Sequence, residues 1–363
     1  MPVMTAARVL PSALPAPRFP DPADAPPLRW GILAPGWIAG MWAETVLANT
    51  NQRIVAAGSR SAERAARFAA QHGIERSYGS YAQLVEDPDV DVVYVASPHS
   101  EHREQALLAI AAGKHVLVEK AFTRNAAEAA EVVAAARAAG VFVMEAMWTR
   151  YLPHTDVVRQ LLDDRALGDV HLVTGDFGVL ADPEPSHRLL NPELAGGVLL
   201  DLGIYPLAWA QLVAGHAGGT GATALAVEPT SIQATGVLAP TGVDAQALVQ
   251  LGWASGVQAQ VFTTMLGATA QTGTVTGSRA RLELGGEFFT PTSVTMVAGD
   301  ERVTWDDNRI TGHAGLCFQA AALARYVAEG RTESPLQPLD ETVAVLRTAD
   351  EVRRQLGVVF PGE

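Results

Sequence analysis

Strand-like and helix-like segments alternate from residue 28 to residue 146, and this alternation restricts the fold more than any other feature of the sequence. Apolar runs predict buried strands at 28–34, 53–58, 90–96, 116–119 and 141–146. Helical patterns separate them at 37–49, 61–72, 101–112 and 126–139. Strands that alternate with helices of about 10–15 residues are typical of βαβ units, so the sequence predicts a parallel, doubly wound sheet.

The pattern changes in the second half of the chain. A helix is expected at 154–164 and a strand at 170–177, and later strand-like runs occur at 231–238, 247–252, 257–265, 273–276, 281–284, 293–297 and 302–305. Gly, Asp and Pro turns separate these runs, which predicts a mostly antiparallel sheet. The run at 257–265 alternates, so one face of this sheet is expected to be free for a second subunit. Two helices are expected last, at 316–328 and 341–356.

Length, charge and cysteine content limit the functions open to the chain. Its 363 residues suggest about two domains, placed at 28–150 and 151–337, with a C-terminal helix at 338–363 that packs back on the first. The net charge of −13 argues against nucleic acid and anionic membranes as partners. The single Cys317 excludes internal disulfides and Cys-rich metal sites, and it suits the reducing cytoplasm. We identify no apolar run of the ~18 residues that a membrane span needs.

Residues 1–27 form a Pro-rich and Ala-rich segment that differs from the rest of the chain. Its prolines interrupt any apolar stretch, which argues against a signal peptide. This composition predicts a disordered tail. The alternative is an extended arm that lies over a partner subunit or over a cofactor.

The turn after the first predicted strand has the shape of a dinucleotide-binding loop. The motif G-x-G-x-x-G/A falls on Ala34, Gly36 and Ala39, with Pro35, Trp37 and Ile38 between them. Gly36 suits the close approach of a pyrophosphate. Ala34 departs from the motif at the tight-turn position. A purely structural turn is the alternative interpretation.

The end of the second predicted strand indicates which dinucleotide is bound. An acid there favours NAD, whereas this chain has Ser59-Arg60-Ser61 and no acid, with Arg64 one turn later. A guanidinium offers a fork of donors that suits a 2′-phosphate. We therefore expect NADP(H) in preference to NAD(H), unless Arg60 is only a solvated surface arginine. The next loop, with Ser97, Pro98, His99 and His102, is expected to pass near the nicotinamide ribose, and no metal site is expected.

Two segments carry side chains suited to catalysis. The strand 116–119 ends in Glu119-Lys120, and ligands bind outside the carboxyl ends of strands in such sheets. Asp201 and Tyr205 are four residues apart on an otherwise apolar helix, so their side chains share one face. Alternatively, Lys120 is a surface lysine and the other two form a buried pair that serves the fold. Candidates for the wall of a substrate pocket are Trp148, Arg150, Arg188, Tyr205 and His313.

These motifs together resemble the Gfo/Idh/MocA oxidoreductases, and within them the branch of dimeric dihydrodiol dehydrogenase and NADP-dependent xylose dehydrogenase. The resemblance runs from Arg29 to the C-terminus, and its motifs are 31–40, Glu119-Lys120-Ala121, 147–153, 196–205, 333–335 and 356–361. It implies an α/β fold: an N-terminal Rossmann doubly wound parallel sheet, then a C-terminal α/β domain with a large, mostly antiparallel open sheet. Together with the single cysteine and the free sheet face, it leads us to expect a cytoplasmic enzyme that forms a homodimer, or a dimer of dimers, through that sheet.

The resemblance further implies hydride transfer between a nicotinamide and a sugar, polyol or diol. Carried over, Tyr205 is the acid and base, Lys120 the electrostatic group that lowers the pKa of the phenol, and Asp201 the orienting group. Many relatives have Pro after the lysine, whose peptide bond can be cis. With Ala121 a cis bond costs ~2.5–4 kcal/mol, so we expect a trans bond or local strain.

Two other functions fit the sequence less well. One is an NADP-binding regulatory protein without turnover, which has no need of Lys120, Asp201 and Tyr205. The other is an NAD-dependent glycoside hydrolase of the same family, against which Ser59-Arg60 argues. The sequence identifies neither the particular sugar or diol nor the physiological direction of the reaction.

Overall fold

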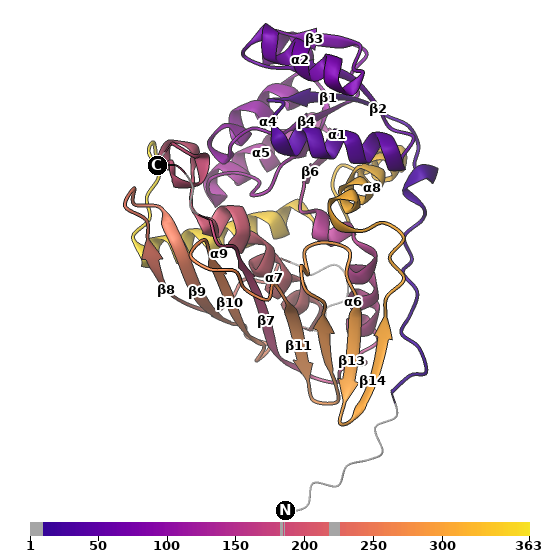
Figure 1. Cartoon of the computed structure of the whole chain (residues 1–363), viewed down its shortest axis with the longest axis vertical. Helices are drawn as coiled ribbons and strands as arrows, with labels where there is room; N and C mark the ends of the chain where they lie inside the picture. The colour runs from indigo at the N-terminus through magenta and orange to yellow at the C-terminus, as the bar shows by residue number, and fades with distance from the viewer. Residues whose placement is uncertain (1–9, 182–183, 185, 218–225) are drawn as a thin grey trace, which may run out of the picture.

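The computed structural model describes residues 10–181, 184, 186–217 and 226–363. Its first half is a six-stranded, all-parallel sheet in the order β3-β2-β1-β4-β5-β6 (Figure 1). The strands are β1 (Arg29–Leu33), β2 (Arg53–Gly58), β3 (Arg76–Tyr78), β4 (Val92–Val95), β5 (His115–Val118) and β6 (Val143–Glu145). The helices between them are α1 (Trp37–Asn49), α2 (Ala62–His72), α3 (Tyr81–Val85), α4 (His102–Ala111) and α5 (Ala126–Ala139).

This topology confirms the predicted doubly wound sheet. The central strand β4 is buried along its whole length, as expected of a Val-rich strand covered by helices on both faces. Ser61 caps α2 by accepting a hydrogen bond from the backbone N–H of Arg64. The prediction missed β3 and α3, because three and five residues are too few to show a periodic pattern.

The second half contains an eight-stranded sheet in the order β14-β13-β12-β11-β7-β10-β9-β8. Its strands are β7 (Val170–Gly178), β8 (Ser231–Leu238), β9 (Asp244–Gly252), β10 (Gln258–Thr264), β11 (Gly273–Gly277), β12 (Arg281–Leu284), β13 (Val294–Ala298) and β14 (Glu301–Trp305). Only the β7–β10 pair is parallel, so the expectation of a mostly antiparallel sheet is confirmed. The helices are α6 (Pro153–Asp163), α7 (Ile204–Ala217), α8 (Cys317–Ala328) and α9 (Leu339–Leu356).

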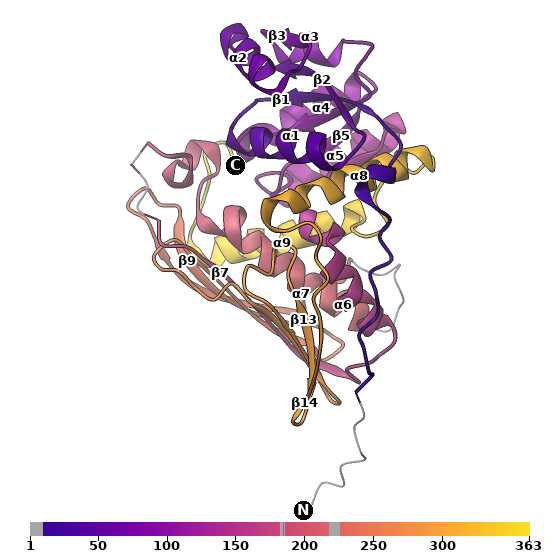
Figure 2. The same ribbon diagram turned by 45° about the vertical axis from the view of Figure 1, so that its right-hand side comes forward.

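Helices α6, α7 and α9 lie on one side of the eight-stranded sheet, and no helix of the described chain covers its other face (Figure 2). Helix α9 contacts α5 of the first half as well as α7 and β8 of the second. It therefore ties the two sheets together.

The segment 192–217, which ends in α7, corrects one expectation from the sequence. It is apolar and long enough to cross a membrane by length and composition, with a mean hydropathy of 1.4. In the folded chain, however, 89% of its apolar window is buried inside the protein. Its apolar character is therefore that of a core helix packed between the large sheet and the neighbouring helices.

The described part of the N-terminal segment, residues 10–27, is neither a disordered tail nor a cover over the pocket. It runs along the outside of α6 and α8 (Figure 1). Arg18 forms an ion pair with Asp156 of α6 at 2.9 Å, and Ala25 is buried against Ala321 and Ala324 of α8. Residues 1–9 lie outside the described part of the chain.

Candidate active site

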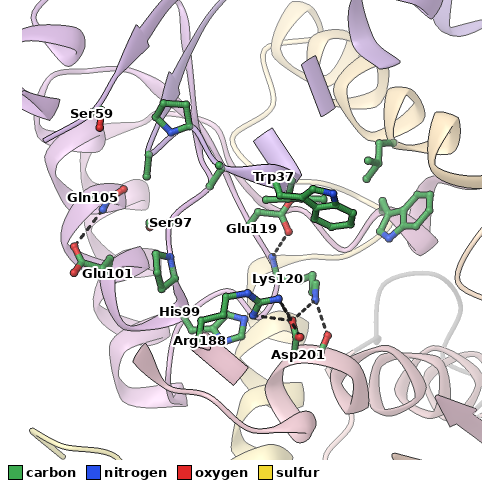
Figure 3. Close-up of a pocket in the computed structure, with 18 of the residues that line it drawn as sticks. Trp37, Ser59, Ser97, His99, Glu101, Gln105, Glu119, Lys120, Arg188 and Asp201 are labelled. Atoms are coloured by element: carbon green, nitrogen blue, oxygen red, sulfur yellow. Dashed lines mark hydrogen bonds and ion pairs between the residues drawn. The ribbon is translucent and has the colours of Figure 1, made fainter. Parts of the chain in front are cut away.

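A cavity of about 640 Å³ lies between the carboxyl ends of the parallel strands and the start of α7 (Figure 3). The predicted residues that line it are Ala34, Pro35, Gly36, Trp37, Ile38, Ser59, Arg60, Ser61, Arg64, Ser97, Pro98, His99, Glu119, Lys120, Trp148, Arg188, Asp201, Tyr205 and His313. Residues far apart in the sequence thus meet in one cavity. Two of the predicted residues, His102 and Arg150, are not among those that line it.

His102 is buried behind the cavity instead of contacting it. Its two ring nitrogens lie 2.9 Å from the carbonyl oxygen of Ala121 and 2.8 Å from that of Ser97. The ring therefore links the loop after β4 to the loop after β5. Its expected contact with a cofactor is wrong, because the ring is fully buried between these two loops. Burial lowers its pKa, so the ring is neutral and donates to only one of the two carbonyl oxygens.

Arg150 also lies away from the cavity, in the core between α7 and α9. It is 1% exposed and forms a 2.7 Å ion pair with the buried Glu341 of α9. The same guanidinium nitrogen donates to the backbone carbonyl of Ala208 in α7, at 2.7 Å. Its predicted place in the pocket wall is therefore wrong. A buried guanidinium without such acceptors would be strongly destabilising, so these contacts hold the side chain in the core.

Lys120, Asp201 and Tyr205 converge at one end of the cavity. The Lys120 ammonium donates to the Asp201 carboxylate at 3.2 Å and to the Asp201 backbone carbonyl at 2.6 Å. It also lies 5.1 Å from the centre of the Tyr205 ring. Arg188 binds the same carboxylate through both terminal nitrogens, at 3.1–3.2 Å (Figure 3).

The backbone around Asp201 explains why its carbonyl oxygen is available to Lys120. Residues Leu199–Gly203 form a π turn that leads into α7. In such a turn the carbonyl of Asp201 would accept from the N–H five residues later. That residue is Pro206, which has no N–H, so the Lys120 ammonium supplies a donor in its place.

The Gly-Gly pair before this turn has a packing role. Gly197 has φ +106°, and an added Cβ would meet a carboxylate oxygen of Asp244 at 2.2 Å. That absence of a side chain lets Asp244, on β9, accept a 2.6 Å hydrogen bond from the backbone N–H of Leu199. Burial raises the pKa of Asp244 to about 7, although the N–H donors favour its charged form. Asp244 therefore anchors the first turn of the segment that carries Asp201 and Tyr205.

The charges at this end are set by burial and by mutual contact. Burial lowers the pKa of Lys120, but Asp201 and Tyr205 raise it by more, so the ammonium form is favoured. Burial raises the pKa of Asp201, but Lys120 and Arg188 outweigh this effect, so the pKa falls well below its usual range. Both side chains are therefore charged at neutral pH.

Tyr205 lies in a mostly aromatic environment. Its hydroxyl accepts a 2.9 Å hydrogen bond from the indole N–H of Trp148, which leaves its own proton available to a ligand. The stacked rings of Phe177 and Phe289, 4.0 Å apart, lie 5.7 and 5.6 Å from the Tyr205 ring. Burial raises the pKa of Tyr205 above its usual value, and Lys120 offsets only part of this effect. The lowering expected from Lys120 is present, but desolvation of the phenolate is the larger effect.

His99 is a second polar group near this end. Burial lowers its pKa to about 3, so its ring is neutral at neutral pH. Its Nδ1 lies 3.1 Å from the carbonyl oxygen of Ala195, and a carbonyl can only accept. The proton is therefore on Nδ1.

The Lys120–Ala121 peptide bond is cis, so the first of the two expected alternatives, a trans bond, is not found. Ala121 is fully buried, and its carbonyl oxygen is paired with His102. The backbone N–H of Lys120 donates to Glu119 at 3.2 Å, and the other oxygen of that carboxylate accepts from Tyr94 at 2.5 Å.

The opposite end of the cavity fits a nicotinamide dinucleotide. Ala34 has φ +57°, so the chain adopts the left-handed turn of the motif without glycine. A Cβ added at Gly36 would have only the Ala34 carbonyl oxygen within 4 Å, at 3.8 Å, so the missing side chain leaves open space. The buried hydroxyl of Ser97 has no partner in the described chain. Gly36 would approach the pyrophosphate, and Arg60 and Arg64 would receive the adenosine end.

The sequence did not identify several residues that line the cavity. Phe177 comes from the end of β7 and Phe289 from the loop between β12 and β13. Tyr81, Glu101 and Gln105 lie at the adenosine end. An aromatic residue near a strand end is too common to be singled out, and only the topology brings these five to one cavity.

Among the described residues, no group of three or more His, Cys, Asp or Glu side chains is arranged to hold a metal ion. The rings of His99 and His102 lie 5.6 Å apart and nearly perpendicular, and each ring nitrogen with a hydrogen bond pairs with backbone. The polar chemistry of this cavity is therefore that of acid, base and cation.

Comparison with known proteins agrees with this geometry. Residues 28–147 match the oxidoreductase family with an NAD-binding Rossmann fold, and residues 155–283 match the GFO/IDH/MocA C-terminal domain. The chain belongs to the Gfo/Idh/MocA family of oxidoreductases, and its first half is an NAD(P)-binding Rossmann domain.

The chain is similar to trans-1,2-dihydrobenzene-1,2-diol dehydrogenases. It is 34% identical to that of Sus scrofa over 342 residues, which cover 92% of this chain and 98% of that protein. The identity to that of Homo sapiens is 33%, over the same shares of the two chains. The protein is thus an enzyme whose relatives are dehydrogenases.

Two solved structures have similar folds. A 3-ketoreductase from Actinomadura kijaniata in complex with NADP and TDP-benzene is 27% identical, with a TM-score of 0.76 over 91% of this chain and 98% of that one. An aldose-aldose oxidoreductase from Caulobacter crescentus has a TM-score of 0.78 at 24% identity over 91% and 97% of the two chains, and it shows the fold alone.

Proposed function

We propose that this protein is an NADP-dependent oxidoreductase that interconverts a hydroxyl and a carbonyl carbon of a diol, polyol or sugar. The observation that carries the proposal is the convergence of Lys120, Asp201 and Tyr205 at one end of a cavity whose other end holds Gly36 and Arg60. When bound, the dinucleotide supplies or accepts the hydride. The chain supplies position, charge and a proton.

Tyr205 is the proton donor when a carbonyl is reduced, and the acceptor when an alcohol is oxidised. Its hydroxyl accepts from Trp148, so its own O–H remains able to donate to a substrate oxygen. Its raised pKa keeps the phenol protonated at neutral pH, as a donor requires. General acid–base help of this kind is worth about 10²–10⁴-fold.

Lys120 and Asp201 act as one unit. The Lys120 ammonium lies beside the Tyr205 ring, where it stabilises negative charge on a phenolate or on a substrate oxygen. Asp201 accepts hydrogen bonds from that ammonium with its backbone carbonyl oxygen and one carboxylate oxygen. Its carboxylate also accepts a hydrogen bond from a second substrate hydroxyl. A substrate with two neighbouring hydroxyls matches this pair of groups.

The aromatic wall supports a cyclic substrate. Trp148 and His313 stack with ring centres 5.8 Å apart, and the stacked Phe177 and Phe289 line the same cavity. Flat apolar faces of this kind contact the face of a ring and exclude water from the reacting atoms. This end of the cavity is therefore lined by aromatic rings, and it is neither a polar cleft nor an open surface.

The preference for NADP(H) over NAD(H) rests on the adenosine end. Arg60 and Arg64 both line the cavity there, next to Ser59 and Ser61. Two guanidinium groups and two hydroxyls suit a 2′-phosphate. The 3-ketoreductase of similar fold was solved with NADP.

We also propose a homodimer, or a dimer of dimers, through the uncovered face of the eight-stranded sheet, and a cytoplasmic location. Leu248 is 41% exposed on β9. Its cross-strand partner is the half-buried Phe262 of the neighbouring strand β10. The single cysteine, Cys317, is buried and free. Oligomeric mass and cell fractionation test these two statements.

A substrate panel tests the proposed reaction. Purified protein is mixed with NADP⁺ and cyclic trans-diols, polyols or aldoses, and with NADPH and the matching carbonyl compounds, while absorbance at the wavelength of NADPH is followed. We expect turnover with at least one cyclic diol or sugar. Binding of NADPH without turnover on any member would instead favour a regulatory protein.

A further inference from the structure

Glu101 places a negative charge at the adenosine end of the cavity. It stands in the short turn His99–Glu101 before α4, and its side chain is 29% exposed. Its carboxylate lies 3.5 Å from the Arg60 guanidinium, which is 72% exposed. The acid that pairs with Arg60 therefore comes from the turn before α4 and not from the end of β2.

The Glu101 carboxylate is held in place by Gln105. The Gln105 amide N–H donates to it at 3.4 Å, one turn along α4 (Figure 3). Gln105 is 3% exposed, so its amide cannot easily turn away. The carboxylate thus stays directed at the space in front of Arg60.

This arrangement opposes the group that Arg60 and Arg64 attract. A 2′-phosphate that binds Arg60 would come within several ångströms of the Glu101 carboxylate, and it carries nearly two negative charges at neutral pH. It would also have to compete with Glu101 for the guanidinium. A ribose 2′-hydroxyl is uncharged and meets neither cost.

We propose that Glu101 is a specificity-determining residue that weakens the preference of this protein for NADP(H) over NAD(H). The ion pair with Arg60 neutralises part of the charge that would hold the phosphate. The inference rests on the proposed function, and it concerns only the balance between the two dinucleotides.

The test is the binding of NADPH and NADH to the wild-type protein and to Glu101→Gln. Dissociation constants are measured by calorimetry or by tryptophan fluorescence, since Trp37 lines the cavity. Glu101→Gln should bind NADPH about three- to tenfold more tightly, the size expected for one charge beside a phosphate at ~6 Å in a water-like dielectric. The affinity for NADH should change less than about twofold. Added salt should reduce the gain for NADPH, because it screens exposed charges.

Glu104→Gln is the matched control. Glu104 is exposed on α4, the helix that follows Glu101, and does not line the cavity. Its substitution changes the net charge by the same amount. It should leave both dissociation constants unchanged. A melting curve checks folding, and Glu101→Ala provides a second variant at the site.

The proposal fails if Glu101→Gln leaves the NADPH constant unchanged, or weakens both dinucleotides equally. Failure of the proposed function is a separate result, in which the wild-type protein binds neither dinucleotide. The two failures are therefore distinguishable in one set of titrations.

Discussion

The protonation state of Tyr205 determines the expected pH dependence of the reaction. Burial keeps its pKa above the usual value of about 10, and His99, with a pKa lowered to about 3, cannot serve as the acid. The phenol is therefore protonated across the neutral range. We expect kcat for carbonyl reduction to stay level between about pH 6 and 9, and to fall only as the pH passes the raised pKa. A kcat that already falls between pH 6 and 7 would identify another group as the acid.

Substitution of Lys120 tests the electrostatic role proposed for its ammonium group beside the Tyr205 ring. The chain has two lysines, and the other, Lys114, binds the backbone carbonyls of Asp87 and Val90 away from the cavity. Lys120→Met should lower kcat by about 10²-fold or more, because it removes the cation beside the Tyr205 ring. Lys114→Met makes the same chemical change and should leave kcat within a few-fold. Steady-state rates of the two variants, normalised to folded protein, provide the comparison.

At this scale the sequence predicted three residues that meet in the cavity, but not every one of their neighbours. Lys120, Asp201 and Tyr205 could be chosen because a charge at a strand end and an acid on an apolar helix are both costly without a reason. Arg150 could not be told from Arg188, since each is followed by two large apolar residues and only the packing buries the first against Glu341. Whether the pKa of Tyr205 is raised or lowered also depends on how deeply its side chain is buried. The spacing of residues in the sequence does not show this burial.

At the scale of elements, the start of α7 depends on Asp244. Its carboxylate accepts the backbone N–H of Leu199 through the space that Gly197 leaves. Asp244→Asn replaces an acceptor with an N–H donor that faces N–H groups, so we expect a loss of about 1–3 kcal/mol in the free energy of unfolding. We also expect kcat to fall about fivefold or more, while NADPH affinity is unchanged, because only the Asp201 and Tyr205 segment shifts.

Asp176→Asn separates these two effects. Asp176 on β7 also accepts backbone N–H groups, those of Gln271 and Thr272, at 2.7 and 3.1 Å. Among the described residues, its carboxylate has no hydrogen bond to α7. It should cost similar stability and leave kcat unchanged. Equal losses of kcat in the two variants would show that stability alone, and not the position of the α7 start, explains the result.

The sequence predicted most elements because their signals are local. The bounds of α1, β2, α5, β8 and β12 coincide with the predicted ranges. The order of the strands in the large sheet was not predictable from the sequence. Strand β7 lies between β11 and β10, which follow it in the sequence by nearly 100 and about 80 residues. The periodicity of a segment does not specify pairings over such separations. The π turn was likewise not visible in the spacing, although Pro206 and Gly203 mark it in retrospect.

For the molecule as a whole, the uncovered sheet face predicts the oligomeric state. Leu248→Glu places a charge on this face, and it should convert a dimer to a monomer in light scattering coupled to size exclusion. Leu47→Glu is the control, since Leu47 is 44% exposed on α1 and Leu248 is 41% exposed on the sheet. The control should remain dimeric. A wild-type protein with the mass of one chain, or a dimeric Leu248→Glu, would contradict the proposed interface.

The proposed function requires that Tyr205 moves the proton in a cavity that separately binds NADPH. The most direct measurement is turnover and NADPH affinity of Tyr205→Phe, with the best substrate of the panel. The substitution removes one hydroxyl and keeps the ring that packs on Phe289. We predict that kcat falls by about 10²-fold or more while the NADPH dissociation constant stays within twofold of the wild type. Near-normal turnover in this variant would contradict the account.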